Sequence, residues 1–103
     1  LLAIVLAVPV MAETLTWTGS SGVNGSKWFI YSTGNWTNSA GATVQWSNAN
    51  DAYFDDGSDY RNVEIASVVS PANITFNISR DMVLTNTSTS GYISSADTFA
   101  NVG

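Results

Sequence analysis

Residues 73–78 have the sequence Asn73-Ile74-Thr75-Phe76-Asn77-Ile78, in which polar and apolar side chains alternate over six positions. Alternation with a period of two places the apolar side chains on one face of a β-strand and the polar side chains on the other. Pro71 stands just before this run, where the missing backbone donor of proline does no harm. The run therefore predicts a β-strand with one buried face.

Shorter runs of β-forming residues lie on both sides of this strand and are separated by turn residues. They are Leu15–Trp17, Trp28–Tyr31, Ala52–Phe54, Asn62–Ile65 and Met82–Thr85. The apolar residues Phe54, Val63, Ile74, Leu84 and Ile93 follow one another at intervals of 9, 11, 10 and 9 residues. No window after residue 12 has a helical period of 3.6 residues. The sequence predicts an all-β fold, in which this spacing suits the rungs of a β-solenoid, a β-sandwich or a barrel.

The composition supports strands and turns over helices. Ser, Thr and Asn make up 35 of the 103 residues, and Thr is β-branched while Asn and Ser compete for backbone hydrogen bonds. Four Trp, four Tyr and four Phe argue against disorder, because disordered segments contain few aromatic residues.

Charge and missing residue types exclude several functions. The net charge is −5, and the three basic residues (Lys27, Arg61 and Arg80) are scattered, so binding to nucleic acid or to an anionic membrane surface is not expected. The chain has no Cys and no His, which excludes disulfides, thiol nucleophiles, histidine-based triads and nearly all zinc sites. We expect no enzymatic activity, no catalytic residue and no cofactor.

The first 12 residues, from Leu1 to Ala12, are apolar and uncharged. Val10-Met11-Ala12 offers small or aliphatic residues at the −3 and −1 positions of a signal-peptidase site. A membrane-spanning helix needs about 20 residues, so residues 1–12 are predicted to be a helical secretory signal peptide, truncated at its start. Residues 13–103 are then the exported β-rich part of a longer protein, which touches a membrane only through the leader before cleavage. The absence of Cys favours a bacterial source.

Two clusters invite a functional interpretation. Trp17, Trp28 and Trp36 are interpreted as interior anchors of a domain without disulfides, the alternative being a sugar-stacking platform. Asp55, Asp56 and Asp59 form the only acidic cluster and are a weak calcium candidate. The cluster lacks the ligand spacing of an EF-hand loop, and a solvated β-turn is the favoured interpretation.

The order of several motifs resembles a known family, the bacterial autotransporter-associated β-strand repeat proteins, over about residues 14–77. The motifs are Thr14-Leu15-Thr16-Trp17-Thr18-Gly19, Trp28, Gly34-Asn35-Trp36, Asp51-Ala52-Tyr53-Phe54-Asp55-Asp56, Val63-Glu64-Ile65 and Val69-Ser70-Pro71-Ala72-Asn73-Ile74-Thr75-Phe76-Asn77. Trp46 is an additional aromatic residue, and residues 29–33 are more apolar than the usual spacer of the family; both depart from the pattern. The resemblance implies the amino-terminal part of an exported passenger that folds as a parallel β-helix.

Two functions follow as expectations. The first is a structural or adhesive module at the cell surface, on the exterior of the outer membrane, with a surface polysaccharide or another cell-surface protein as partner. The alternative is a carbohydrate-binding module of a secreted polysaccharide-degrading protein, assisted by calcium. Further Gly/Asn/Thr-rich repeats after residue 103 would favour the first, and a catalytic domain the second.

Overall fold

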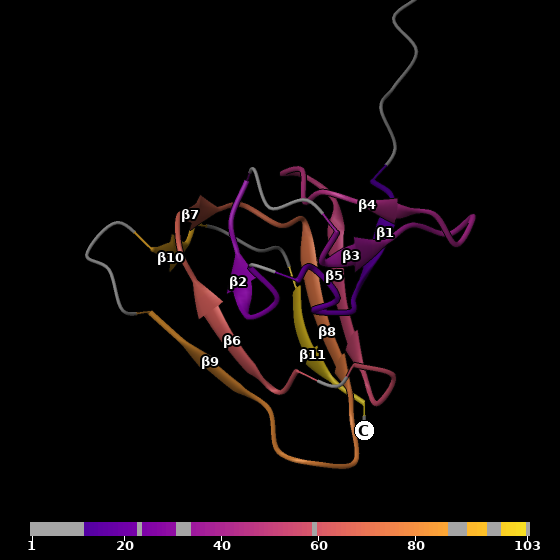
Figure 1. Ribbon diagram of the computed structural model, residues 1–103, viewed down its shortest axis with the longest axis vertical. Coiled ribbons are helices and arrows are strands. Elements are labelled where there is room, and N and C mark those ends of the chain that lie inside the picture. Colours follow the sequence, from indigo (N-terminus) through magenta and orange to yellow (C-terminus); the bar gives the residue numbers. More distant parts are fainter. Residues whose placement is uncertain are drawn as a thin grey trace, which may run out of the picture.

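A computed structural model describes residues 12–22, 24–30, 34–58, 60–86, 91–94 and 98–102. Within these residues the chain forms strands, turns and loops and no helix (Figure 1), which confirms the predicted all-β class. The predicted leader helix lies outside the described residues, except for Ala12, which has no regular secondary structure. The described part of the chain contains no helix with the length and apolarity required to cross a membrane.

The strands are short and belong to three sheets. In chain order they are β1 (Thr14–Trp17), β2 (Lys27–Trp28), β3 (Trp36–Thr37), β4 (Thr43–Val44), β5 (Asp51–Asp55), β6 (Asn62–Ile65), β7 (Val68–Val69), β8 (Asn73–Asn77), β9 (Val83–Thr85), β10 (Tyr92–Ile93) and β11 (Thr98–Asn101). The first sheet has the order β11-β8-β5-β1-β3-β4, the second β2-β6-β9 and the third β10-β7.

Most strand pairs are parallel and join segments far apart in the sequence. In the first sheet Ala52 of β5 pairs with Ile74 of β8, and Ile74 pairs in turn with Phe99 of β11. In the second sheet β6 pairs with β9, and in the third β7 pairs with β10. Strands that follow one another in the chain, such as β5, β6 and β7, therefore lie in three different sheets (Figure 1).

The first sheet ends in an antiparallel hairpin, which makes this sheet mixed. Strand β3 pairs with β1 on one side and with β4 on the other, both antiparallel. The turn between β3 and β4 is closed by Asn38, whose Oδ1 accepts hydrogen bonds from the N–H groups of Ala40 and Ala42 at 3.1 and 2.9 Å. Gly41 has a φ of +81° in this turn, a value that glycine adopts without a steric penalty.

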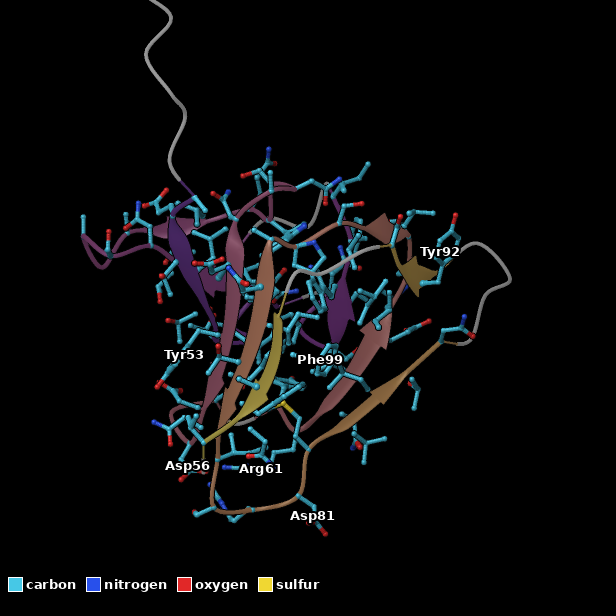
Figure 2. All side chains as sticks on the ribbon, turned by 180° about the vertical axis from the view of Figure 1, so that it is seen from behind. Tyr53, Asp56, Arg61, Asp81, Tyr92 and Phe99 are labelled. Carbon is cyan, nitrogen blue, oxygen red and sulfur yellow. The ribbon has the colours of Figure 1, made fainter. Side chains whose placement is uncertain are left out.

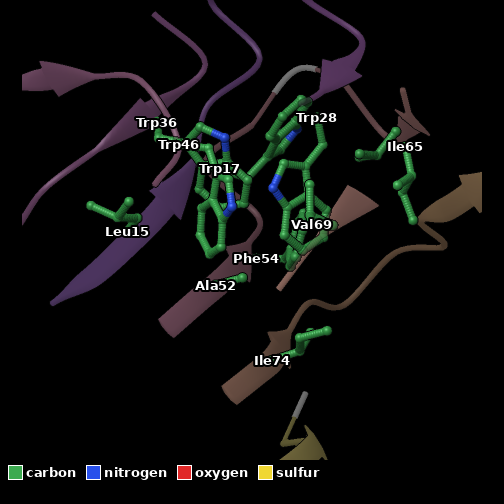
Figure 3. Packing of buried hydrophobic residues seen from close by; sticks show 11 residues of the cluster. Leu15, Trp17, Trp28, Trp36, Trp46, Ala52, Phe54, Ile65, Val69 and Ile74 are labelled. Carbon is green, nitrogen blue, oxygen red and sulfur yellow. The ribbon is translucent and has the colours of Figure 1, made fainter. Parts of the chain in front are cut away.

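All three sheets contribute side chains to one buried cluster (Figure 3). Alternation decides which residues enter it: in β5, Ala52 and Phe54 are buried, and in β6, Val63 and Ile65 are buried. The cluster consists of Leu15, Trp17, Trp28, Trp36, Trp46, Ala52, Phe54, Val63, Ile65, Val69 and Ile74. The in-register parallel pairing places buried positions of successive strands side by side, so each row of the core continues from strand to strand.

The predicted strands are found with some changes of extent. The prediction over Trp28–Tyr31 is wrong for Phe29 and Ile30, because β2 ends at Trp28. The N–H of Ile30 bonds to the Ser67 hydroxyl at 3.2 Å instead of to a strand. Tyr31 lies outside the described residues. Ile78 and Met82 also fall just outside β8 and β9, and the predicted runs do not include the short strands β3, β4, β7, β10 and β11.

Gly91, next to the third sheet, lies where the structure leaves no space for a side chain. Gly91 precedes β10, and a Cβ atom at this position would overlap the carbonyl oxygen of Ile65, at the end of β6. We expect Gly91→Ala to force β10 away from β7 and to destabilise the fold by about 1–3 kcal/mol, the usual cost of overpacking. Urea unfolding followed by tryptophan fluorescence measures the loss. Gly22→Ala is the matched control, because a Cβ atom at Gly22 meets nothing within 4 Å; equal effects of the two substitutions would contradict the expectation.

Candidate functional site

The four tryptophans lie in the interior. Trp28, Trp36 and Trp46 have an exposed fraction of 0% and Trp17 of 1%. Their ring centroids lie 4.8 to 5.2 Å from the nearest indole, mostly in edge-to-face arrangements, and Phe54 contacts three of the four (Figure 3). The prediction that Trp17, Trp28 and Trp36 are interior anchors is confirmed, and the alternative of a tryptophan platform for sugars is wrong, because no ring face is open to solvent.

Two of the indole N–H groups have partners and two do not. Trp17 Nε1 donates to the carbonyl of Tyr60 at 3.2 Å, and Trp46 Nε1 donates to Asn48 Oδ1 at 2.9 Å. Trp28 Nε1 and Trp36 Nε1 are buried without a hydrogen-bond partner among the described residues. An unpaired buried donor costs about 1–3 kcal/mol, whereas burying about 200 Å² of indole contributes up to about 5 kcal/mol. Packing therefore outweighs the unpaired donors.

Asn35, which directly precedes Trp36 in the sequence, is fully buried. Its Nδ2 donates to the carbonyls of Asn24 and Lys27 at 2.6 and 2.8 Å, and its Oδ1 accepts from the N–H of Ser21 at 3.0 Å. Its own carbonyl accepts from the N–H of Thr18 at 2.8 Å. A single side chain thus organises the Gly/Ser-rich loop between β1 and β2.

We expect Asn35→Leu to destabilise the fold by about 3 kcal/mol, because three partly buried backbone groups lose their partner. The midpoint of urea unfolding measures this loss. Asn62→Ala provides the control, since Asn62 is exposed on β6 and surface substitutions usually stay within about 0.5 kcal/mol. A change of that small size for Asn35→Leu would refute the role of Asn35.

Asp55 and Asp56, two residues of the weak calcium candidate, make separate contacts within turns. Asp55 Oδ1 accepts a hydrogen bond from the N–H of Gly57 at 2.9 Å, as in an Asx turn. Asp56 accepts from the Ser79 N–H at 3.0 Å and from the Ser79 hydroxyl at 2.8 Å, and its Oδ1 lies 3.6 Å from Arg61 Nη2. Asp59 lies outside the described residues, and within the described part no three acidic side chains gather around a possible metal position.

Ser58 is a buried residue of this turn that sequence analysis missed. Its exposed fraction is 1%, and its hydroxyl lies 3.0 Å from the carbonyls of Thr18 and Tyr60, toward which it donates. The hydroxyl also accepts from the N–H of Tyr60 at 3.1 Å. The turn after β5 is therefore fixed to the loop after β1.

The environment of Asp56 favours its charged form. Hydrogen bonds from the backbone N–H and then from the hydroxyl of Ser79 lower the pKa of Asp56 below its ordinary value of 3.8. Burial opposes this shift, and the positive charges of Arg61 and Arg80 add to the lowering. A lowered pKa in the folded state means that the stabilisation is present above the pKa of the unfolded chain. It is lost as the pH falls through the lower pKa of the folded state.

We expect Asp56→Asn to lower the urea midpoint at pH 7, and the difference from the parent chain to shrink as the pH falls below about 4. At still lower pH the carboxyl of the parent is protonated in both states, and the difference disappears. Asp81→Asn removes the same charge from an exposed position and serves as the control. A pH-independent difference would show that Asp56 acts through shape and not through its charge.

The final edge of each sheet exposes apolar side chains. The last strands are β11, β9 and β10, and Phe99, Val83 and Tyr92 on them have exposed fractions of 63%, 46% and 53%. Beside the edges of β9 and β11 lies a hollow of about 480 Å³ whose apolar lining includes Phe76, Met82, Leu84 and Phe99. Figure 2 shows Phe99 at this edge of the first sheet. We therefore define β9, β10, β11 and this hollow as the open end.

A second hollow lies on the outer face of the first sheet. It measures about 250 Å³ and is lined by Thr14, Asp51, Ala52, Tyr53, Asn73 and Thr75, from β1, β5 and β8. Tyr53 projects from β5 between the buried residues Ala52 and Phe54, and therefore toward the opposite face (Figure 2). This outer groove is a candidate ligand site. The alternation in Asp51-Ala52-Tyr53-Phe54-Asp55 is the sequence signal that could have identified Tyr53 as an outward residue.

No known protein family, curated protein or solved structure matches this chain. The geometry of the open end and of the outer groove is therefore the basis for a functional proposal.

Proposed function

We propose that residues 13–103 are a structural and adhesive module of the cell surface. In this proposal they form the first section of an exported parallel β-helix of the autotransporter-associated type, and residues 1–12 act as its secretion signal. The observation that carries the proposal is a recurrence in strand order: β5, β6 and β7 pair in parallel with β8, β9 and β10, respectively.

This recurrence is the arrangement expected of coils in a solenoid. One coil contains β5, β6 and β7, the next contains β8, β9 and β10, and β11, which pairs with β8, begins a third. Each strand then bonds to its equivalent in the coil before it, so that one core runs through successive coils. The rings of Phe54, Phe76 and Phe99 follow this direction, with centroid distances of 5.1 and 5.8 Å.

The two ends of the stack differ, as the proposal requires. At the first end the β3–β4 hairpin covers the edge of β1, and the tryptophans fill the interior. Solenoids need such a cap, because an unpaired edge would recruit other strands. Within the described part of the chain, the open end instead offers strand edges without a partner strand and exposed apolar side chains, the surface on which a further coil would stack.

The test is to add one more coil. Asn101 of β11 pairs with Phe76 of β8, so a second copy of residues 77–101 joined after Asn101 continues the repeat in register. We expect one cooperative urea transition, a higher midpoint and a slope increased by about a quarter, because the slope scales with the surface buried on folding. The same added segment in scrambled order is the control and should change neither quantity.

If the added copy leaves the midpoint and slope unchanged, and a protease trims the chain back to its original end, the solenoid proposal is wrong. Such a result would favour a closed fold in which β11 is a finished edge.

A further inference from the structure

We propose that the outer groove binds a neutral polysaccharide and is the adhesive contact of this module. The inference rests on the proposed surface function and names the ligand class for it. The site is the hollow across β1, β5 and β8, on the face of the first sheet opposite the tryptophan core.

Register arranges the polar side chains of the groove in two rows. One row contains Thr14 and Asp51, which are paired, followed by Asn73 on β8. The other contains Thr16, Tyr53 and Thr75, of which Tyr53 and Thr75 line the hollow. Strands in a sheet lie about 4.8 Å apart, so the rows present hydroxyl, carboxylate and amide groups at short, regular intervals. Such an array suits a ligand that carries many hydroxyl groups.

Hydrogen bonds within the protein hold this array in place before a ligand arrives. Asn73 Nδ2 donates to Asp51 Oδ1 at 2.7 Å, and Asn77 Nδ2 donates to the Tyr53 hydroxyl at 2.8 Å. The Tyr53 oxygen accepts that bond, so its own proton is left to donate to a ligand. Side chains that are already ordered lose less entropy on binding.

Tyr53 supplies the apolar part of the site. Tyr53 is half-buried and lines the hollow, and its neighbours in the row, Thr16 and Thr75, have shorter side chains. A sugar ring has an apolar face of C–H groups that can stack on an aromatic ring, while its hydroxyls reach the polar groups around it. Tyr53 therefore provides the sugar-stacking surface that the sequence offered as an alternative role for Trp17, Trp28 and Trp36.

Charge selects among polysaccharides. Among the described residues that line the groove, Asp51 is the only charged one, and the whole chain has a net charge of −5. A carboxylate accepts hydrogen bonds from sugar hydroxyls but repels uronate or sulfate groups. A neutral glycan is thus favoured over an acidic one.

The experiment is isothermal titration calorimetry of the full chain with three probes: cellohexaose, mannohexaose and a hexamer of galacturonic acid. We expect saturable binding of at least one neutral hexasaccharide with a Kd of about 1 mM or tighter, and weaker binding of the acidic hexamer. Tyr53→Ala should weaken binding at least about tenfold, and Asp51→Asn, which keeps the shape of the side chain, several-fold. Tyr92→Ala is the matched control, because Tyr92 is exposed on β10, away from the groove.

Absence of binding to both neutral probes overturns the inference, as does tighter binding of the acidic hexamer. An equal loss with Tyr53→Ala and Tyr92→Ala, at unchanged urea midpoints, also overturns it. If Tyr53→Ala fails to fold, an unchanged affinity of Asp51→Asn overturns it instead. None of these outcomes affects the added-coil experiment, so failure of the glycan site can be distinguished from failure of the solenoid proposal.

Discussion

Packing of four indole rings against one another, and of three of them against Phe54, is the interaction on which the rest of this structure depends. The chain has no disulfide and no histidine, and the strands that the structure describes contain only two to five residues. Strands this short do not hold together through backbone hydrogen bonds alone. The rings come from β1, β2, β3, the loop after β4, and β5, so one cluster ties together segments of the first and second sheets. Its burial is large enough to tolerate two indole N–H groups without partners among the described residues.

The parallel ladders extend this cluster along the molecule. Because register is set in β1, β5 and β8, apolar residues stay inside and Thr, Asn, Asp and Tyr stay outside on these strands of the first sheet. The same constraint produces both candidate sites. The inward rows end at the open end, where Phe99 is uncovered, and the outward rows form the groove around Tyr53. The same strand register therefore determines both the buried core and the proposed ligand groove.

Local alternation explains which features could be predicted. The runs around Val63 and Ile74 could be predicted as strands because they alternate polar and apolar residues, and the run around Ala52 because the turn residues Asp55-Asp56-Gly57 close it. The strands β7 and β11 were missed, since two residues such as Val68–Val69 carry no period, and Thr98-Phe99-Ala100-Asn101 does not alternate between polar and apolar residues. The regular interval between apolar residues was real, but it separates strands of different sheets. Strand β5 pairs with β8, and β6 and β7 lie between them in the chain.

By itself the sequence determined the all-β class, the extent of the best strands and the burial of the tryptophans, since these follow from period, composition and hydrophobicity. Only the tertiary structure decided the partners of each strand, the burial of Asn35 and Ser58, and the division of the Asp55–Asp56 pair into separate turn contacts. It also decided that Tyr53, and not a tryptophan, faces the outer groove. The physical reason is that these properties depend on contacts between residues far apart in the chain, which no local pattern records.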